Sequence, residues 1–277
     1  MADVSTATLG DYQVDIATDF GPRVVGLHRA GGPQILAQLA PDVGIEHPGG
    51  RFRFHGGHRL WAAPERAEIT YANDDHPCQV VIGEGSVTIS ADRDAAGVRK
   101  EVTVTADDDS LIVAHSIAWQ STEIRAPLAA WAITQLPLGG TALVPLEGPD
   151  TSPLPNRQLI LWPYTSPADE RIRYGNRGLE VMARGQNRLK LGVGPALSFL
   201  GYLWNGWLFT KRALSRSGGE IPDHGAGNQV YVGQGFCELE TVGGLSHGPS
   251  AHITERWKLQ PCGDLQNAWA IVGEGQA

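Results

Sequence analysis

The sequence is poor in cysteine and in long hydrophobic runs, and each shortage excludes a class of protein. The three cysteines are odd in number, far apart and form no C-x-x-C pair, a pattern typical of reduced thiols in a cytosolic protein. The apolar runs fall short of the ~20 residues that a membrane helix requires. The N-terminus has no positive segment followed by an apolar stretch, which argues against a signal peptide. We therefore expect a cytoplasmic protein with no membrane partner.

Basic residues are also scarce. Twenty-two lysines and arginines face thirty aspartates and glutamates, for a formal net charge of −8. A nucleic-acid-binding protein neutralises phosphates with clustered lysine and arginine, and the nearest approach to a basic run, around residues 211–216, is interrupted by apolar and small residues. The composition therefore excludes a nucleic-acid partner and favours a small-molecule ligand.

Helical periodicity is weak, whereas turn-forming residues are abundant. Thirty-five glycines and eighteen prolines leave little room for long helices. The best helical pattern, Gln34–Leu39, is too short for an independent helix. With 42% hydrophobic and 19% charged residues, the chain is nevertheless globular in composition.

Period-two alternation predicts strands in most of the chain after residue 78. The segments 98–105 and 110–119 flank an Asp-Asp-Asp turn, and 79–82 and 86–90 flank Gly83-Glu84-Gly85, so each pair predicts a hairpin. Further strands are expected at 129–136, 159–162, 179–183, 188–193, 207–211, 229–232, 236–242 and 251–259. Many evenly spaced strands without a fixed repeat indicate an all-β antiparallel sandwich. We expect residues 1–277 to form a single domain.

Two short motifs match catalytic or calcium-binding patterns only in part. The segment GLSHG at 244–248 fits the nucleophile elbow G-x-S-x-G, but a strand pattern follows it where a helix is needed. The segment DRDAAG at 92–97 begins like a calcium loop but lacks the ligands at its fifth and twelfth positions. We interpret the second as a hairpin turn.

A possible zinc cluster consists of His55 and His58, with Asp74, Asp75 and His76 farther along the chain. A zinc site needs a defined third and fourth ligand, which the spacing does not supply, and loop histidines in a polar pocket are the simpler alternative. No phosphate-binding glycine motif is present either. We therefore expect no metal and no cofactor.

Two other segments combine residues suited to a sugar site. In HGGHRLWAAPE at 55–65, His58, Arg59 and Trp61 bring a titratable ring, a cation and an aromatic face together. The alternative is a buried Trp61 with Arg59 in an ion pair. In GQGFCELETV at 233–242, Glu238 and Glu240 project to one face of a strand. Burial would raise the pKa of at least one carboxyl toward the range of a general base; the alternative is a solvated outer face.

These segments resemble galactose mutarotases (aldose 1-epimerases). GFCELET at 235–241 is similar to the G-F-C-L-E-T-Q stretch of that family, and GPSAHITERW at 248–257 resembles its P-G-E-x-x-x-H-x-x-x-W tail. GGHRLWAAPE at 56–65 is similar to the G-G-x-x-x-W-P segment of hexose-phosphate mutarotase relatives. Together they resemble an uncharacterised branch of the mutarotase-like superfamily. The resemblance implies a β-supersandwich of about this length.

The resemblance also implies roles for individual residues. Glu240 falls on the family glutamate that takes the proton of the anomeric hydroxyl, and Glu238 is an added neighbour. The family's catalytic histidine has no counterpart in the strand at 128–135, although Trp131 there is a candidate for substrate binding. Ring opening also needs an acid on the ring oxygen. We expect His58 to supply it.

Further candidates for substrate contact or for the acid are Arg59, Lys211 and His224. We expect four of the selected residues to converge on one face: His58, Arg59, Trp61 and Glu240.

Three functions remain open. The first is an isomerase acting on a sugar or sugar-like hemiacetal. The second is a carbohydrate-binding protein without catalysis. The third is a cleft reused for isomerisation, elimination or cyclisation of another polar cyclic metabolite.

Overall fold

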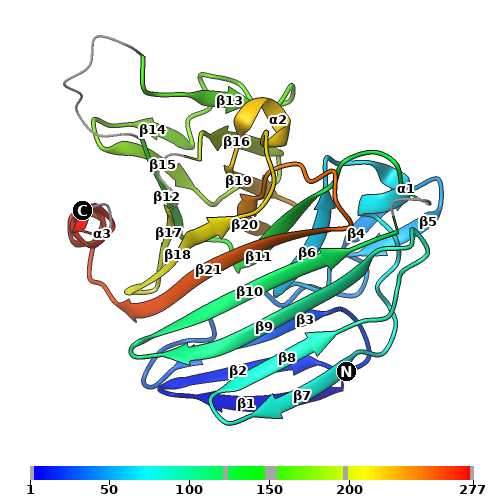
Figure 1. Ribbon diagram of the computed structural model, residues 1–277. Helices are drawn as coiled ribbons and strands as arrows, with labels where there is room; N and C mark the ends of the chain where they lie inside the picture. Colours follow the sequence, from blue (N-terminus) through cyan, green and yellow to red (C-terminus); the bar gives the residue numbers. More distant parts are fainter. Residues whose placement is uncertain (1–2, 121–123, 147–154, 196–198, 275–277) are drawn as a thin grey trace.

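The computed structural model describes residues 3–120, 124–146, 155–195 and 199–274, and almost all of its regular structure is β. Two large antiparallel sheets pack face to face, and a small two-stranded sheet pairs with neither of them (Figure 1). The two predicted hairpins form as expected. This is the antiparallel sandwich that the alternation predicts.

The nine-stranded sheet has the order β1-β2-β3-β6-β11-β20-β19-β16-β13. Its strands are β1 (Val4–Leu9), β2 (Tyr12–Ala17), β3 (Arg23–Arg29), β6 (His58–Ala63), β11 (Ala129–Pro137), β13 (Leu159–Leu161), β16 (Leu189–Val193), β19 (Asn228–Gly233) and β20 (Phe236–Val242). Strand β11 lies between β6 and β20. The segments 55–65 and 233–242, far apart in the sequence, are therefore two strands apart in space.

The ten-stranded sheet has the order β14-β15-β12-β17-β18-β21-β10-β9-β8-β7. Its strands are β7 (Gln79–Gly83), β8 (Ser86–Ser90), β9 (Arg99–Asp107), β10 (Ser110–Ala118), β12 (Thr141–Pro145), β14 (Ile172–Tyr174), β15 (Gly178–Met182), β17 (Phe199–Trp204), β18 (Trp207–Arg216) and β21 (Ser250–Pro261). Strands β4 (Gly44–His47) and β5 (Gly50–Arg53) pair only with each other.

The main hydrophobic core lies between the two large sheets. Alternate residues of β9, β10 and β21 point inward, as the burial of Val102, Val104, Val113 and Ile253 shows. Because successive side chains on a strand point to opposite faces, the other residues of each strand are free to form a second surface. On the nine-stranded sheet that second surface is also largely buried.

The aromatic cluster covers the outer face of the nine-stranded sheet, beneath the β4–β5 hairpin. We give this name to Phe52, Phe54, Trp61, Tyr71, Trp131, Tyr231 and Phe236, together with the smaller apolar residues around them. Edge-to-face ring pairs join Trp61 to Phe52, Tyr71 and Trp131, the geometry that aromatic quadrupoles favour.

Three short helices complete the described part of the chain: α1 (Ala67–Thr70), α2 (Pro222–Gly225) and α3 (Leu265–Glu274). Helix α3 packs beside β17 on the far side of the molecule from α1 (Figure 1). The weak helical pattern at Gln34–Leu39 forms no helix. None of the helices in the described ranges is long and apolar enough to cross a membrane.

Candidate functional site

The candidate site lies on the outer face of β6, β11 and β20, at the edge of the aromatic cluster. It is a pocket of about 110 Å³. Its lining is aromatic with charged groups between the rings: Ile45, Phe54, Arg59, Trp61, Glu65, Tyr71, Trp131, Tyr164, Arg188, Lys190, Tyr231, Gln234, Phe236 and Glu238. The structure therefore brings together Arg59, Trp61, Trp131 and Glu238, four of the residues selected from the sequence.

Glu240 lies directly beneath this pocket and is fully buried. Its Oε2 accepts hydrogen bonds from Trp131 Nε1 and Lys190 Nζ, each at 2.8 Å, whereas its Oε1 has no partner among the described residues. Burial raises the pKa of the Glu240 carboxyl to about 7, and the adjacent Lys190 ammonium limits the increase. A carboxyl with such a pKa can gain or lose a proton near neutrality.

Glu238, two residues earlier on the same face of β20, accepts hydrogen bonds from Arg59 NH2 at 2.8 Å and from Gln135 Nε2 at 3.0 Å. The Arg59 guanidinium also lies 4.1 Å from the centre of the Trp61 ring. Its Nε and NH1, and Nε1 of Trp61, are buried without a hydrogen-bond partner in the described structure. Buried unpaired donors are costly, so a ligand that accepts hydrogen bonds would satisfy them.

Lys190 is the main site residue that the sequence analysis missed. Its ammonium lies 4.7 Å from the ring centres of both Trp131 and Trp162, and its side chain is only 7% exposed. One signal was available in the sequence: a lysine within the apolar strand predicted at 188–193. Because a lysine is almost never buried without a partner, its position indicated a buried ion pair. Its partner, Glu240, is fifty residues away in the chain, and local patterns cannot reveal such a pair.

The expected convergence of His58 with Glu240 is wrong. His58 is fully buried between the two sheets, on the opposite face of β6 from its neighbour Arg59. There its Nδ1 meets Thr134 Oγ1 at 2.9 Å and its Nε2 meets His115 Nε2 at 2.8 Å. Because side chains alternate along a strand, His58 and Arg59 cannot both face the pocket.

The hydrogen bonds around His58 also indicate a neutral ring. His115 Nδ1 faces the Ile253 carbonyl at 3.2 Å, and since a carbonyl only accepts, that nitrogen carries the proton. His115 Nε2 is then the acceptor for His58 Nε2. Burial lowers the pKa of His115 to about 4. Burial and the neighbouring His115 together lower the pKa of His58 well below its usual value. His58 therefore has neither the position nor the charge of the expected acid.

Lys211 is in the same interior layer, not in the pocket. Its Nζ is 3.1 Å from Glu255 Oε1 and donates to the carbonyls of Ala132 and Leu239, both at 3.2 Å. It thus links β18 and β21 of one sheet to β11 and β20 of the other. The Lys211 ammonium thereby fixes the backbone of β20 from the inner side of the sheet, at Leu239, which lies between Glu238 and Glu240 in the sequence.

His224 is likewise outside the pocket. It is exposed on α2, with a left-handed φ of 57°, and its carbonyl accepts a hydrogen bond from Gln158 Nε2 at 2.8 Å. Of the sequence-selected residues, His58, Lys211 and His224 are therefore the three that the structure separates from the pocket.

The partial motifs have structural roles. Ser246 of the G-x-S-x-G segment forms a β-bridge with Leu128, and no helix follows it. Asp94 of the calcium-like segment binds Lys100 Nζ at 2.7 Å and accepts from the backbone amides of Ala96 and Val98. Those bonds fix the turn between β8 and β9.

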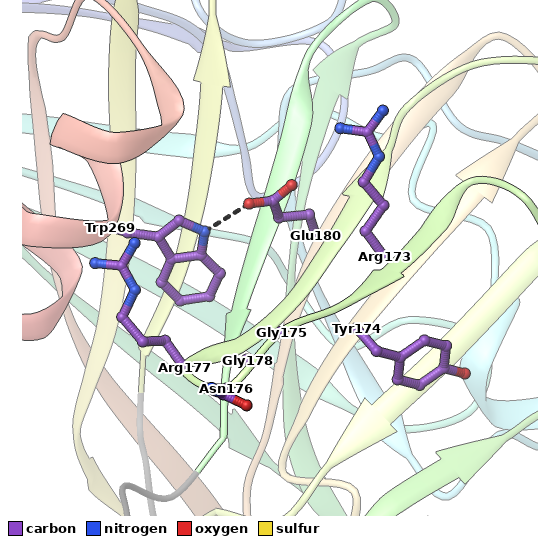
Figure 2. Close-up of a pocket in the computed structure, with 8 residues that line it drawn as sticks. All are labelled: Arg173, Tyr174, Gly175, Asn176, Arg177, Gly178, Glu180 and Trp269. Atoms are coloured by element: carbon purple, nitrogen blue, oxygen red, sulfur yellow. Dashed lines mark hydrogen bonds between the residues drawn. The ribbon is translucent and has the colours of Figure 1, made fainter.

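Two of the other hollows in the described structure lie away from this pocket. One, of about 360 Å³, lies between the β14–β15 turn and α3 (Figure 2). There Trp269 Nε1 donates to Glu180 Oε1 at 2.8 Å, and the Arg177 guanidinium lies 5.4 Å from the Trp269 ring. None of the buried unpaired polar atoms belongs to its lining residues. The other, of about 660 Å³, is lined by His55, Asp75 and mainly apolar residues near β1 and β3.

The raised pKa of Glu240 predicts a pH-dependent tryptophan signal. Trp131 donates to Glu240, so ionisation of the carboxyl should change its fluorescence. We expect a transition with a midpoint near pH 7 in the parent protein, with Glu240 protonated below it and ionised above it. The transition should disappear in Glu240→Gln and persist in Glu238→Gln. A transition unchanged in Glu240→Gln would contradict the assignment.

Comparison with known proteins identifies the fold. No protein-family model matches the sequence, and neither does any curated protein. Among solved structures, a candidate aldose 1-epimerase from Escherichia coli K12 aligns with a TM-score of 0.54 at 12% identity, over 94% of this chain and 100% of the other. A galactose mutarotase-like protein from Clostridium acetobutylicum aligns with a TM-score of 0.52 at 8% identity, over 94% and 99%.

A candidate aldose 1-epimerase from Klebsiella pneumoniae subsp. pneumoniae gives a TM-score of 0.53 at 9% identity, over 96% of this chain and 80% of the other. These identities are too low to carry function, but the alignments extend over nearly the whole chain. The expectation of a mutarotase-like sandwich is confirmed, and the protein has the galactose mutarotase-like fold.

Proposed function

We propose that this protein is an isomerase that opens and recloses the ring of a sugar or sugar-like hemiacetal, with Glu240 as the general base. The observation that supports it best is the state of Glu240: a buried carboxyl with a pKa of about 7, one unpaired oxygen, and a position beneath an aromatic pocket. Aromatic faces bind the C–H faces of sugars, and unpaired donors such as those of Arg59 suit hydroxyl groups.

In this proposal Glu240 Oε1 takes the proton of the anomeric hydroxyl. Because Glu240 is covered by Trp131 and Lys190, the substrate must displace part of that cover, and the flexible Lys190 side chain is the one that can move. The Lys190 ammonium, 2.8 Å from Glu240 Oε2, then donates a proton to the ring oxygen and opens the ring. After rotation about the bond between C1 and C2, the hydroxyl that was the ring oxygen attacks the other face of the aldehyde. Both protons return to their first positions, and the second anomer is formed.

The charges around the pocket favour a neutral substrate. Arg59 and Lys190 are paired with Glu238 and Glu240, so their charges are largely compensated before a ligand binds. A second candidate function, carbohydrate binding without catalysis, is favoured by one observation: no histidine lines the pocket in the described ranges. An ammonium is a weaker acid than an imidazolium, which argues for slow turnover of common hexoses.

The proposal is tested by polarimetry on a panel of aldoses that contains galactose, glucose and further neutral hexoses and pentoses, with uronates and sugar phosphates as charged comparisons. We expect weak acceleration with free galactose and glucose and faster interconversion of another neutral cyclic aldose. Lys190→Gln should remove the acceleration because it removes the acid. Arg212→Gln, on the exposed part of β18, is the control. Saturable binding of an aldose with no acceleration for any member of the panel would favour the binding protein.

A further inference from the structure

We propose that His55, Asp74 and Asp75 bind one divalent transition-metal ion, at a site separate from the pocket above Glu240. One potential ligand atom of each residue lies within 4.8 Å of the other two. One imidazole and two carboxylates suit a borderline ion such as Zn²⁺. In the sequence these three residues are considered together with His58 and His76, and no metal is expected; the structure separates His58, which lies between the sheets, from the other three.

Asp74 gives the first indication of a ligand. Its side chain is 10% exposed, and Arg23 NH2 donates to its Oδ2 at 2.7 Å. Its Oδ1 is buried and has no hydrogen-bond partner in the described structure. A buried carboxylate oxygen without a partner is costly, whereas a carboxylate held by an arginine through one oxygen and by a metal through the other is satisfied at both.

His55 and Asp75 provide the open side of the site. Both line the pocket of about 660 Å³, which shares no residue with the lining of the other pocket. The His55 ring stacks on Phe20 with 3.9 Å between ring centres, which fixes its plane. Its Nε2 lies 2.6 Å from Asp75 Oδ1.

Metal binding would replace that hydrogen bond. Ligand atoms about 2.0–2.2 Å from a zinc ion are roughly 3 Å or more apart, so Nε2 and Oδ1 must separate slightly. The imidazole must then carry its proton on Nδ1, because the metal takes the lone pair of Nε2. Water from the pocket would complete the coordination.

The charges nearby permit a dication. Asp19, Asp74 and Asp75 face Arg23 and Arg53 in this region, which leaves one negative charge in excess. Arg23 is fully buried and also donates to the carbonyls of Phe54 and Gly56. Arg23 therefore orients Asp74, and it does not itself occupy the position of the ion among His55, Asp74 and Asp75.

The test is calorimetric titration of ZnCl₂ into the full chain at pH 7.5, after dialysis against chelator. We expect saturable binding of one ion per chain, weakened by at least about tenfold in His55→Gln and in Asp75→Asn. His28→Gln is the matched control: His28 Nε2 lies 4.0 Å from Asp15 Oδ2, but among the described residues it belongs to no cluster with a second carboxylate. Its affinity should equal that of the parent.

Absence of saturable binding would overturn the proposal, and so would binding that both variants leave unchanged. Equal loss in His28→Gln would also overturn it, because the ion would then bind exposed histidines generally. Circular dichroism checks the fold of each variant. If His55→Gln does not fold, Asp75→Asn decides, since it is isosteric and its side chain is 28% exposed in the parent.

Discussion

Glu240→Gln is expected to lower turnover of the accepted aldose by about 10²–10⁴-fold, the usual contribution of a general base. Glutamine has the same shape and its amide oxygen can still accept from Trp131, so the pocket should keep its form. It cannot take a proton from the anomeric hydroxyl. The loss should therefore appear in kcat, measured by polarimetry, while binding of the aldose, measured by calorimetry, changes little.

Two variants make this result specific. Glu84→Gln, in the exposed turn between β7 and β8, applies the same chemical change far from the pocket and should leave turnover at the parent level. Glu238→Gln tests the neighbouring carboxylate, which holds Arg59, and should raise KM more than it lowers kcat. If Glu238→Gln abolishes turnover and Glu240→Gln does not, Glu238 is the base and the assignment of Glu240 is wrong.

Lys211→Met should give the largest loss of stability, about 3–5 kcal/mol of the free energy of unfolding. The substitution leaves Glu255 fully buried without its cation and removes three hydrogen bonds, to Ala132, Thr134 and Leu239. Burial favours the neutral form of Glu255, but Lys211 and His115 hold its pKa below the ordinary value. Urea unfolding followed by circular dichroism measures the loss.

The control is Lys258→Met, which removes a partly exposed ion pair with Asp109 on the same sheet and should cost less than about 1 kcal/mol. The double variant Lys211→Met with Glu255→Gln should recover part of the loss, because glutamine can still accept from Trp257. Equal destabilisation by Lys211→Met and Lys258→Met would show that the buried pair contributes no more than a surface pair.

Most of the strands after residue 78 were predicted from the sequence but none before it, although β1 and β2 also alternate between exposed and buried residues. Strands β9, β10 and β20 follow the expected ranges closely because alternation is visible wherever one face is charged. Strand β6 was not recognised as a strand because its sequence, two polar residues followed by four apolar ones, does not alternate. Strand β14, with three residues, is too short for any period to appear.

The limits of local sequence patterns also explain which site residues could be predicted and which could not. Glu238, Glu240, Arg59 and Trp61 could be selected because they occur in compact segments with unusual chemistry. His58 was misplaced because the segment 55–65 was not predicted to contain a strand, and neighbouring side chains on a strand point to opposite faces. The pairing of Lys190 with Glu240 depends on the order of strands β11, β20, β19 and β16, which no local pattern specifies.

The division of β6, β11 and β20 into two faces has a consequence for how this protein can evolve. Odd-numbered positions of β6 and β11 and even-numbered positions of β20 lie on the outer face that carries the candidate pocket, while the intervening ones build the layer between the sheets. Substitutions at the first set change the outer face without entering the layer between the sheets. Insertion or deletion of a single residue in any of these strands would exchange the two sets. The side chains of the outer face are therefore free to diverge among descendants by substitution, whereas the lengths of these three strands are constrained.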